Sequence, residues 1–240
     1  MPSLLDVSFA VLFAIVIVIG GGTYFDRRLK RQLADNVPDA RRNWYRGTVI
    51  GEWILAALTV VLWSKAGRAW RALGFEPPTD WRLYVGITLA AIVAVFVLRQ
   101  NATVRALPPD RLQRLVPKFT GVESIVPRTP SEYQWFQAVS WTAGVCEELL
   151  YRGFLTWLVA AYAGPAAALV IVSVAFGLGH AYQGPKGIVK VSMLGVVFGS
   201  IVLASGWLIP AMFIHAMIGL ASGTVGFAVL GQGARRLAAD

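Results

Sequence analysis

The stretch AVSWTAGVCEELLYRGFLTWLVAAY, residues 138–162, decides the fold, because it places a charged cluster inside a long apolar run. Runs of about 20 apolar residues cross a bilayer as helices. The whole chain is 56% hydrophobic and 15% charged. A soluble domain carries about a quarter charged residues. The sequence therefore predicts an integral membrane protein.

Seven apolar segments predict an all-α, polytopic transmembrane helical bundle. The expected spans are residues 4–25, 48–64, 83–98, 133–162, 165–183, 187–206 and 207–231. Eight spans are the alternative, because the last segment is long enough to form two pieces. No internal repeat is visible, so residues 1–240 are interpreted as a single membrane domain.

The basic residues are distributed unevenly between the two sides of this seven-helix arrangement. Seventeen of the 22 Lys and Arg residues fall on one side, including the pair Arg235 and Arg236 near the end of the chain. Because basic connectors stay in the cytoplasm, we expect an outside N-terminus and a cytoplasmic C-terminus. The net charge of +9 then indicates membrane lipids as partners, not nucleic acid. The short chain, rich in Ala, Arg and Gly, favours a bacterial inner (plasma) membrane.

The charged cluster divides into a pair and a surplus carboxylate. Glu148 and Arg152 are four residues apart on a helix, so they share a face and are expected to form an ion pair. Glu147 is turned by roughly 100° from Glu148 and lacks that partner. Its neighbour four residues on is Tyr151, whose hydroxyl is a candidate donor. Charged groups inside a bilayer are costly and usually functional, so Glu147 is the candidate general base.

The only two histidines of the chain, His180 and His215, both fall in later apolar segments. At about 1.5 Å per residue, Glu147 and His180 are expected at a similar depth, because each lies 15 residues from the outer end of its helix. His215 is only eight residues from Trp207 and fits this depth only if its helix starts deeper in the membrane. A shared site of the three residues is the hypothesis.

These motifs resemble the CAAX prenyl protease and bacteriocin-processing intramembrane proteases, the abortive-infection type. The family pattern is Glu-Glu-x-x-x-Arg, then Phe-x-x-x-His, then His-x-x-x-Asn or Asp, each on a membrane helix. The first motif runs from Glu147 to Arg152, the second from Phe176 to His180, and the third begins at His215. The resemblance covers a catalytic core of about residues 133–225. The third motif departs from the family, because Gly219 stands at its last position.

The resemblance implies a role for each residue. Glu147 would activate a water that it shares with His180, and His215 would stabilise the oxyanion. Glu148 and Arg152 would support the first motif helix, with Tyr151 and Phe176 as further supporting residues. Gly219 has no side-chain donor, so Ser222 or a backbone N–H would have to replace the family's Asn. The resemblance thus implies hydrolysis of a peptide or membrane-protein substrate.

Two other chemistries remain open at this stage. The same three residues, Glu147, His180 and His215, could instead hold Zn²⁺ as three ligands of a catalytic site. The sequence lacks the local His-Glu-x-x-His spacing of zinc proteases, so the mechanism without a metal or other cofactor is favoured. The single cysteine, Cys146, is a third candidate nucleophile, although a buried Cys usually serves packing.

The sequence therefore predicts an intramembrane endopeptidase that cuts a peptide bond near the cytoplasmic membrane face. A non-catalytic scaffold of the same family is one alternative, because it would explain Gly219. An ion- or proton-coupled transporter is the other, because it could use the same intramembrane Glu, His and Arg residues. Such a transporter is expected to show repeats, and none is visible.

Overall fold

The computed structural model describes residues 1–232, without the side chains of residues 15–19 and 232. It is 85% helical, and the part that it describes contains no strand. Arg235, Arg236 and the C-terminus lie outside the described residues. Five helical segments are long and apolar enough to cross a membrane: Ala40–Lys65, Trp81–Arg105, Pro130–Gly179, Ala181–Ser205 and Leu208–Gly231. The predicted helical membrane bundle is confirmed.

The first rod is formed by α1 (Leu4–Val11), η1 (Leu12–Gly21) and α2 (Gly22–Ala34). Ser3 and Asp6 form a capping box at its start. The rod continues nine residues beyond the predicted end at position 25. One reason is the ion pair of Asp26 with Lys30, 2.8 Å long and four residues apart, which stabilises a further helical turn after the apolar run.

Two longer helices follow, and both extend beyond their predicted bounds. These are α3 (Ala40–Lys65) and α4 (Trp81–Arg105), with the short η2 (Trp70–Leu73) between them. The next connector holds α5 (Pro109–Gln113), η3 (Val116–Phe119) and η4 (Glu123–Ile125). Its apolar side chains join the end of the bundle in a small buried cluster of Val104, Leu112, Val126, Val229 and Leu230.

A long helical segment carries the charged cluster. It runs through α6 (Pro130–Glu148), η5 (Leu149–Leu155) and α7 (Thr156–Gly179). Gly164 interrupts α7 with a φ of 80°, which favours glycine, and Pro165 starts the returning limb. The predicted break between residues 162 and 165 is therefore confirmed. The chain ends with η6 (Ala181–Gln183), α8 (Gly184–Ser205), α9 (Leu208–Gly226) and η7 (Phe227–Gln232).

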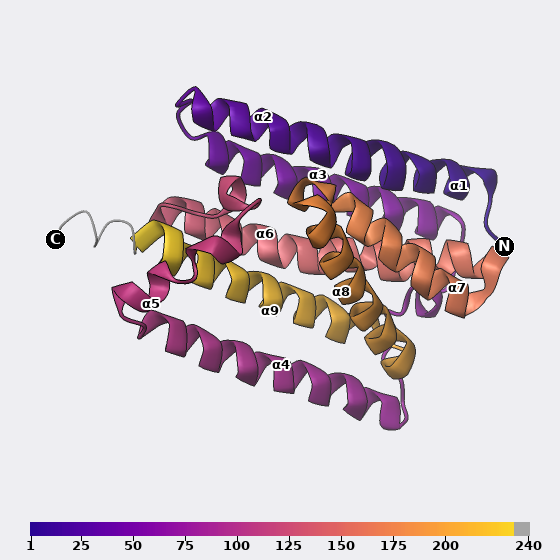
Figure 1. Ribbon diagram of the computed structural model, residues 1–240. Helices are drawn as coiled ribbons and strands as arrows, with labels where there is room; N and C mark the ends of the chain where they lie inside the picture. The colour runs from indigo at the N-terminus through magenta and orange to yellow at the C-terminus, as the bar shows by residue number, and fades with distance from the viewer. Residues whose placement is uncertain (233–240) are drawn as a thin grey trace.

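Helices α6 and α9 form the antiparallel centre of the bundle, between α1–α3 on one side and α4 on the other (Figure 1). Their backbones approach closely, since a Cβ on Gly144 would lie 2.7 Å from the Cβ of Ala216. Small residues allow such contact between membrane helices. The outer helices expose large apolar side chains, among them Ile50, Ile54, Leu58, Ile92, Phe96 and Leu98. This extended apolar surface suits contact with lipid.

The connectors gather at the two ends of the bundle. Residues 35–39 and 106–129 lie at one end with η7, whereas residues 66–80 lie at the end of the N-terminus (Figure 1). The first end therefore contains the basic residues that flank positions 35–39, such as Arg31 and Arg41, and those of residues 106–129, which the sequence places on one side of the membrane. The orientation of that end toward the cytoplasm stays a prediction.

Arg68 ties the connector after α3 to the first helix. Its guanidinium donates two hydrogen bonds, of 2.8 and 2.5 Å, to the two carboxylate oxygens of Asp6, which is 2% exposed. We expect Arg68→Gln to lower the free energy of unfolding by about 2–3 kcal/mol, because it leaves a buried carboxylate without its charged partner. Chemical denaturation in detergent measures this difference.

The control for this prediction is Arg82→Gln. Arg82 and Asp80 form an exposed pair at 4.0 Å, and such pairs contribute little to stability. A loss of the same size in both variants would show that the burial of Asp6 does not matter.

Candidate active site

The charged cluster lies where the α-helix changes its pitch. α6 ends at Glu148, and the next seven residues form the π-helical η5, in which every residue is buried. π-helical turns occur frequently at functional sites. The sequence did not predict this change, which sets the direction of each side chain after Glu148.

Glu148 and Arg152 form the predicted ion pair. Oε1 of Glu148 lies 2.9 Å from Nη1 of Arg152, and their side chains are 0% and 2% exposed. The guanidinium also lies over the ring of Phe176, 4.2 Å from its centroid, and 5.3 Å from that of Phe198. The pair is thus enclosed by aromatic rings that connect α7 and α8 to the motif helix.

His215 on α9 is held by the same carboxylate. Its Nδ1–H donates to Oε1 of Glu148 over 2.8 Å. Its Nε2 then faces Glu147, 3.8 Å from Oε2. The ring stacks on Phe198 with centroids 4.9 Å apart and planes at 15°. A carboxylate that binds one ring nitrogen fixes the orientation of a histidine, as in hydrolase triads.

The start of α9 bears on the depth of His215. α9 begins at Leu208, which is fully buried and whose N–H donates to the carbonyl of Gly74 over 2.8 Å. The start of the helix is therefore covered by the connector 66–80, and the depth at which it begins in the membrane stays a prediction. α8 runs without a break to Ser205, so a separate re-entrant piece is not needed in this described part of the chain.

Glu147 is the carboxylate without a strong partner. Its side chain is 19% exposed, and its buried Oε2 accepts no hydrogen bond. The expected hydrogen bond from Tyr151 is wrong: no such bond joins the two residues, both of which the structure describes. The ring of Tyr151 instead packs edge-on against Phe13 and Phe176, with centroids 5.2 and 5.0 Å away. These aromatic contacts direct Tyr151 away from its predicted role.

The second motif reaches the site through Phe176. Its ring lies 4.9 Å from that of His180 and 5.9 Å from that of His215, so it packs against both histidines. Nδ1–H of His180 donates to the carbonyl of Phe176 over 2.9 Å, which leaves Nε2 free. His180 makes no direct contact with Glu147 or His215 among the described side chains. A water shared by His180 and Glu147 stays a prediction.

The three motifs, far apart in the sequence, thus meet around Phe176 and the two carboxylates. Residues 129–221 match the family model described as Type II CAAX prenyl endopeptidase Rce1-like. This segment is similar to that family. The resemblance to the CAAX protease family is therefore confirmed. No curated protein and no solved structure matches the chain.

The Rce1-like segment departs from the expected third motif for a structural reason. A Cβ on Gly219 would lie 2.9 Å from Cβ and 3.0 Å from Oγ of Ser140 on α6. Helix packing therefore leaves no room for an Asn or Asp side chain at this position. The suggested substitute, Ser222, is exposed and donates to the carbonyl of Ile218 in its own helix.

Restoring the family residue is expected to disturb the fold. Gly219→Asn should lower the free energy of unfolding by about 1–3 kcal/mol, because it overpacks the contact between α6 and α9. Adding Ser140→Gly should recover most of this loss by making room. Denaturation of the single and double variants measures both effects, and a fully stable Gly219→Asn would contradict the packing account.

The metal alternative, with Glu147, His180 and His215 as ligands, stays a prediction. No group of three or more His, Cys, Asp or Glu within the described residues is placed to hold a metal ion. Glu147 and His215 face each other, and the ring of Phe176 contacts both histidines. Cys146, the third candidate, is fully buried in the apolar cluster that includes Phe13 and Leu149. These apolar surroundings indicate that the Cys146 side chain serves core packing.

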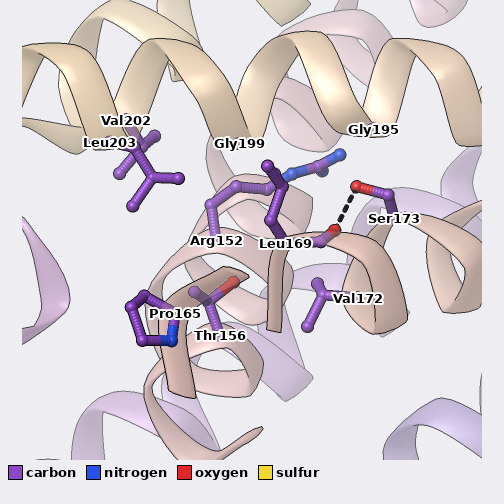
Figure 2. Close-up of a pocket in the computed structure, with 10 residues that line it drawn as sticks. All are labelled: Arg152, Thr156, Pro165, Leu169, Val172, Ser173, Gly195, Gly199, Val202 and Leu203. Atoms are coloured by element: carbon purple, nitrogen blue, oxygen red, sulfur yellow. Dashed lines mark hydrogen bonds between the residues drawn. The ribbon is translucent and has the colours of Figure 1, made fainter. Parts of the chain in front are cut away.

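A small pocket lies behind the ion pair, between α7 and α8. Figure 2 shows the side chain of Arg152 extending along α8 toward Gly195 and Ser173. A Cβ on Gly195 would lie 3.2 Å from Nη2 of Arg152, and one on Gly199 would lie 2.4 Å from Leu169. The small-x-x-x-small pattern of α8 thus makes room for the guanidinium and for helix packing.

Glu52 on α3 is the residue that the sequence reasoning missed. Its buried Oε2 has no hydrogen-bond partner, and its charge interacts with that of Glu147. A signal was available, because Glu52 is the single charged residue in the apolar segment 48–64. An intramembrane carboxylate marks a functional site by default.

Proposed function

We propose that the protein is an intramembrane endopeptidase that hydrolyses a peptide bond with a water activated by Glu147. The observation that carries this proposal is the position of His215, whose Nδ1 binds Glu148 while its Nε2 faces Glu147. The match to CAAX proteases supports peptide hydrolysis as the class of reaction. We place cleavage near the cytoplasmic face, because the basic connectors favour that location.

In this mechanism, Glu147 takes a proton from water while the water oxygen attacks the scissile carbonyl carbon. The carbonyl bond's electron pair moves to oxygen, where the protonated Nε2 of His215 donates a hydrogen bond to the oxyanion. Such a donor contributes about 3–4 kcal/mol to transition-state stabilisation. The C–N bond then breaks, and Glu147 returns its proton to the leaving amine. We expect the free Nε2 of His180 to help hold the water.

Glu148 and Arg152 act through His215 in this account. Glu148 accepts from Nδ1 and thereby keeps Nε2 directed toward Glu147. Arg152 holds Glu148 in place through the same oxygen, Oε1. No step of this mechanism uses a metal.

The test is cleavage of a library of quenched-fluorescence peptides by purified protein in lipid vesicles. Wild type should cleave at least one peptide class, and His215→Gln should lose about 10²–10³-fold in kcat with little change in KM. His180→Gln tests the second histidine in the same assay. Equal cleavage by wild type and His215→Gln would reject the proposed role of His215. Absence of cleavage by wild type would favour the non-catalytic scaffold.

A further inference from the structure

We propose that Glu52 is a further positioning residue of this site, which holds the attacking water together with Glu147. This inference rests on the proposed function and deepens it. Nothing in the Glu-Glu-x-x-x-Arg, Phe-x-x-x-His or His-x-x-x-Asn pattern includes a residue on α3. The role follows from the placement of Glu52 and from two carboxylate oxygens that lack donors.

Glu52 lies on the face of α3 that is turned into the bundle. The neighbouring positions on this face are buried: Tyr45, Ala56, Thr59 and Trp63. Ala56 is 3% exposed, and the other three are 0% exposed. With Glu52 included, they follow one another at helical spacings of seven, four, three and four residues. The side chain is therefore on the inward stripe of the helix, while Trp53 and Ile54 are exposed.

The contacts between α3 and α6 set the height of Glu52 relative to Glu147. Helices α3 and α6 run side by side in the same direction (Figure 1). Tyr45 packs against Phe136, Nε1 of Trp53 donates to Thr142, and Trp63 packs against Trp157. These contacts set the register of the two helices.

This register places the two carboxylates within about two helical turns of each other along the helix axes. Their charges are close enough to interact, which agrees with that placement. Glu52 and Glu147 therefore belong to the same region of the interior.

Each of the two residues also has a carboxylate oxygen without a hydrogen-bond donor. Oε2 of Glu52 and Oε2 of Glu147 are both buried, and neither accepts a hydrogen bond from the protein. Buried acceptors are normally paired, so a donor must lie between or beside them. Two ionised carboxylates cannot supply donors to each other, whereas a water has two O–H groups, one for each oxygen.

A water held in this way is oriented for attack. With both O–H groups bound, its lone pair is free to approach the carbonyl carbon of a substrate. As the new C–O bond forms, the proton passes to Glu147, and it later leaves with the amine. Glu52 keeps its own hydrogen bond throughout and exchanges no proton. It therefore increases the turnover rate without contributing to substrate binding.

The alternative is that Glu52 has only a structural role in the fold. A buried carboxylate without a donor destabilises a protein, so removing it should not lower stability. This difference separates the two roles. Glu52→Met keeps the approximate volume and removes both oxygens, and Glu52→Asp keeps the carboxylate on a shorter side chain. Glu76→Met is the matched control, because Glu76 is exposed in the connector after η2.

The kinetic experiment compares these variants in vesicles on the best peptide found for wild type. We expect Glu52→Met to lose about 10²-fold in kcat with an unchanged KM and an unchanged or higher melting temperature. Glu52→Asp should recover part of kcat, and Glu76→Met should equal wild type. A wild-type kcat in Glu52→Met overturns the inference and leaves the proposed function standing. A lost kcat accompanied by a lower melting temperature also overturns it, because Glu52 would then be structural.

A second measurement tests the pairing without any substrate. In a double-mutant cycle of Glu52→Met and Glu147→Met, the two changes in stability should not add, because each removes the same repulsion. Additive changes overturn the shared site. If wild type cleaves no peptide, the hydrolytic role of both residues is rejected, and the cycle alone then reports whether the two carboxylates interact.

Discussion

Replacing Glu147 with Gln is expected to reduce kcat/KM for peptide cleavage by about 10²–10⁴-fold, the range for loss of a general base. Gln has nearly the same size and cannot take the proton of the attacking water. Because Oε2 of Glu147 accepts no hydrogen bond from the protein, the substitution breaks no hydrogen bond of that atom. The melting temperature should therefore stay near that of wild type.

The control for Glu147→Gln is Glu76→Gln, the same substitution at an exposed position. Its activity should equal that of wild type. An active Glu147→Gln would show that another group activates the water, and an unfolded one would show that Glu147 has a structural role. Single-turnover rates in vesicles, measured beside the melting temperatures, distinguish these outcomes.

Arg152→Met is expected to have the largest effect on stability. It removes the partner of Glu148, which is fully buried, and unpaired buried charges cost about 3–5 kcal/mol. The contacts of the guanidinium with the rings of Phe176 and Phe198 are lost as well. Chemical denaturation in detergent should show this loss directly.

The double variant Glu148→Met/Arg152→Met separates stability from activity. An apolar pair of similar volume should recover most of the stability, because no buried charge remains. Activity should stay lost, because Nδ1 of His215 no longer has its acceptor. A stable and active double variant would mean that Glu148 does not orient His215. A double variant less stable than Arg152→Met would contradict the account of the buried charge.

Features of the fold that depend on near neighbours in sequence were predictable. The ion pair of Glu148 with Arg152 follows from their spacing of four residues, and the break at Gly164 follows from the adjacent Gly and Pro. Helix ends were less well predicted. α2 continues past the apolar run through charged residues, because the ion pair of Asp26 with Lys30 stabilises a further helical turn there.

Features of the site that depend on tertiary packing were not predictable. The hydrogen bond of His215 with Glu148 joins residues 67 positions apart, and it gives Glu148 an orienting role that spacing alone could not suggest. Likewise, Gly219 looks like a lost functional group in the sequence. Only the contact with Ser140 shows why a larger residue is excluded.

Glu52 is a different case, because its charge inside an apolar segment is visible in the sequence. It was overlooked because it matches no motif and has no charged neighbour on its own helix. Its relation to Glu147 appears only when α3 lies beside α6. An isolated carboxylate inside the membrane is therefore as strong a candidate for a functional residue as one within a motif.

The most direct test of the central claim is the single-turnover cleavage rate of wild type and Glu147→Gln after exhaustive treatment with a zinc chelator. The account predicts that wild type retains its rate, because Glu147 activates the water without a metal, and that Glu147→Gln remains inactive. A wild-type rate that is lost with chelator and restored by added Zn²⁺ would contradict the account and assign water activation to the metal.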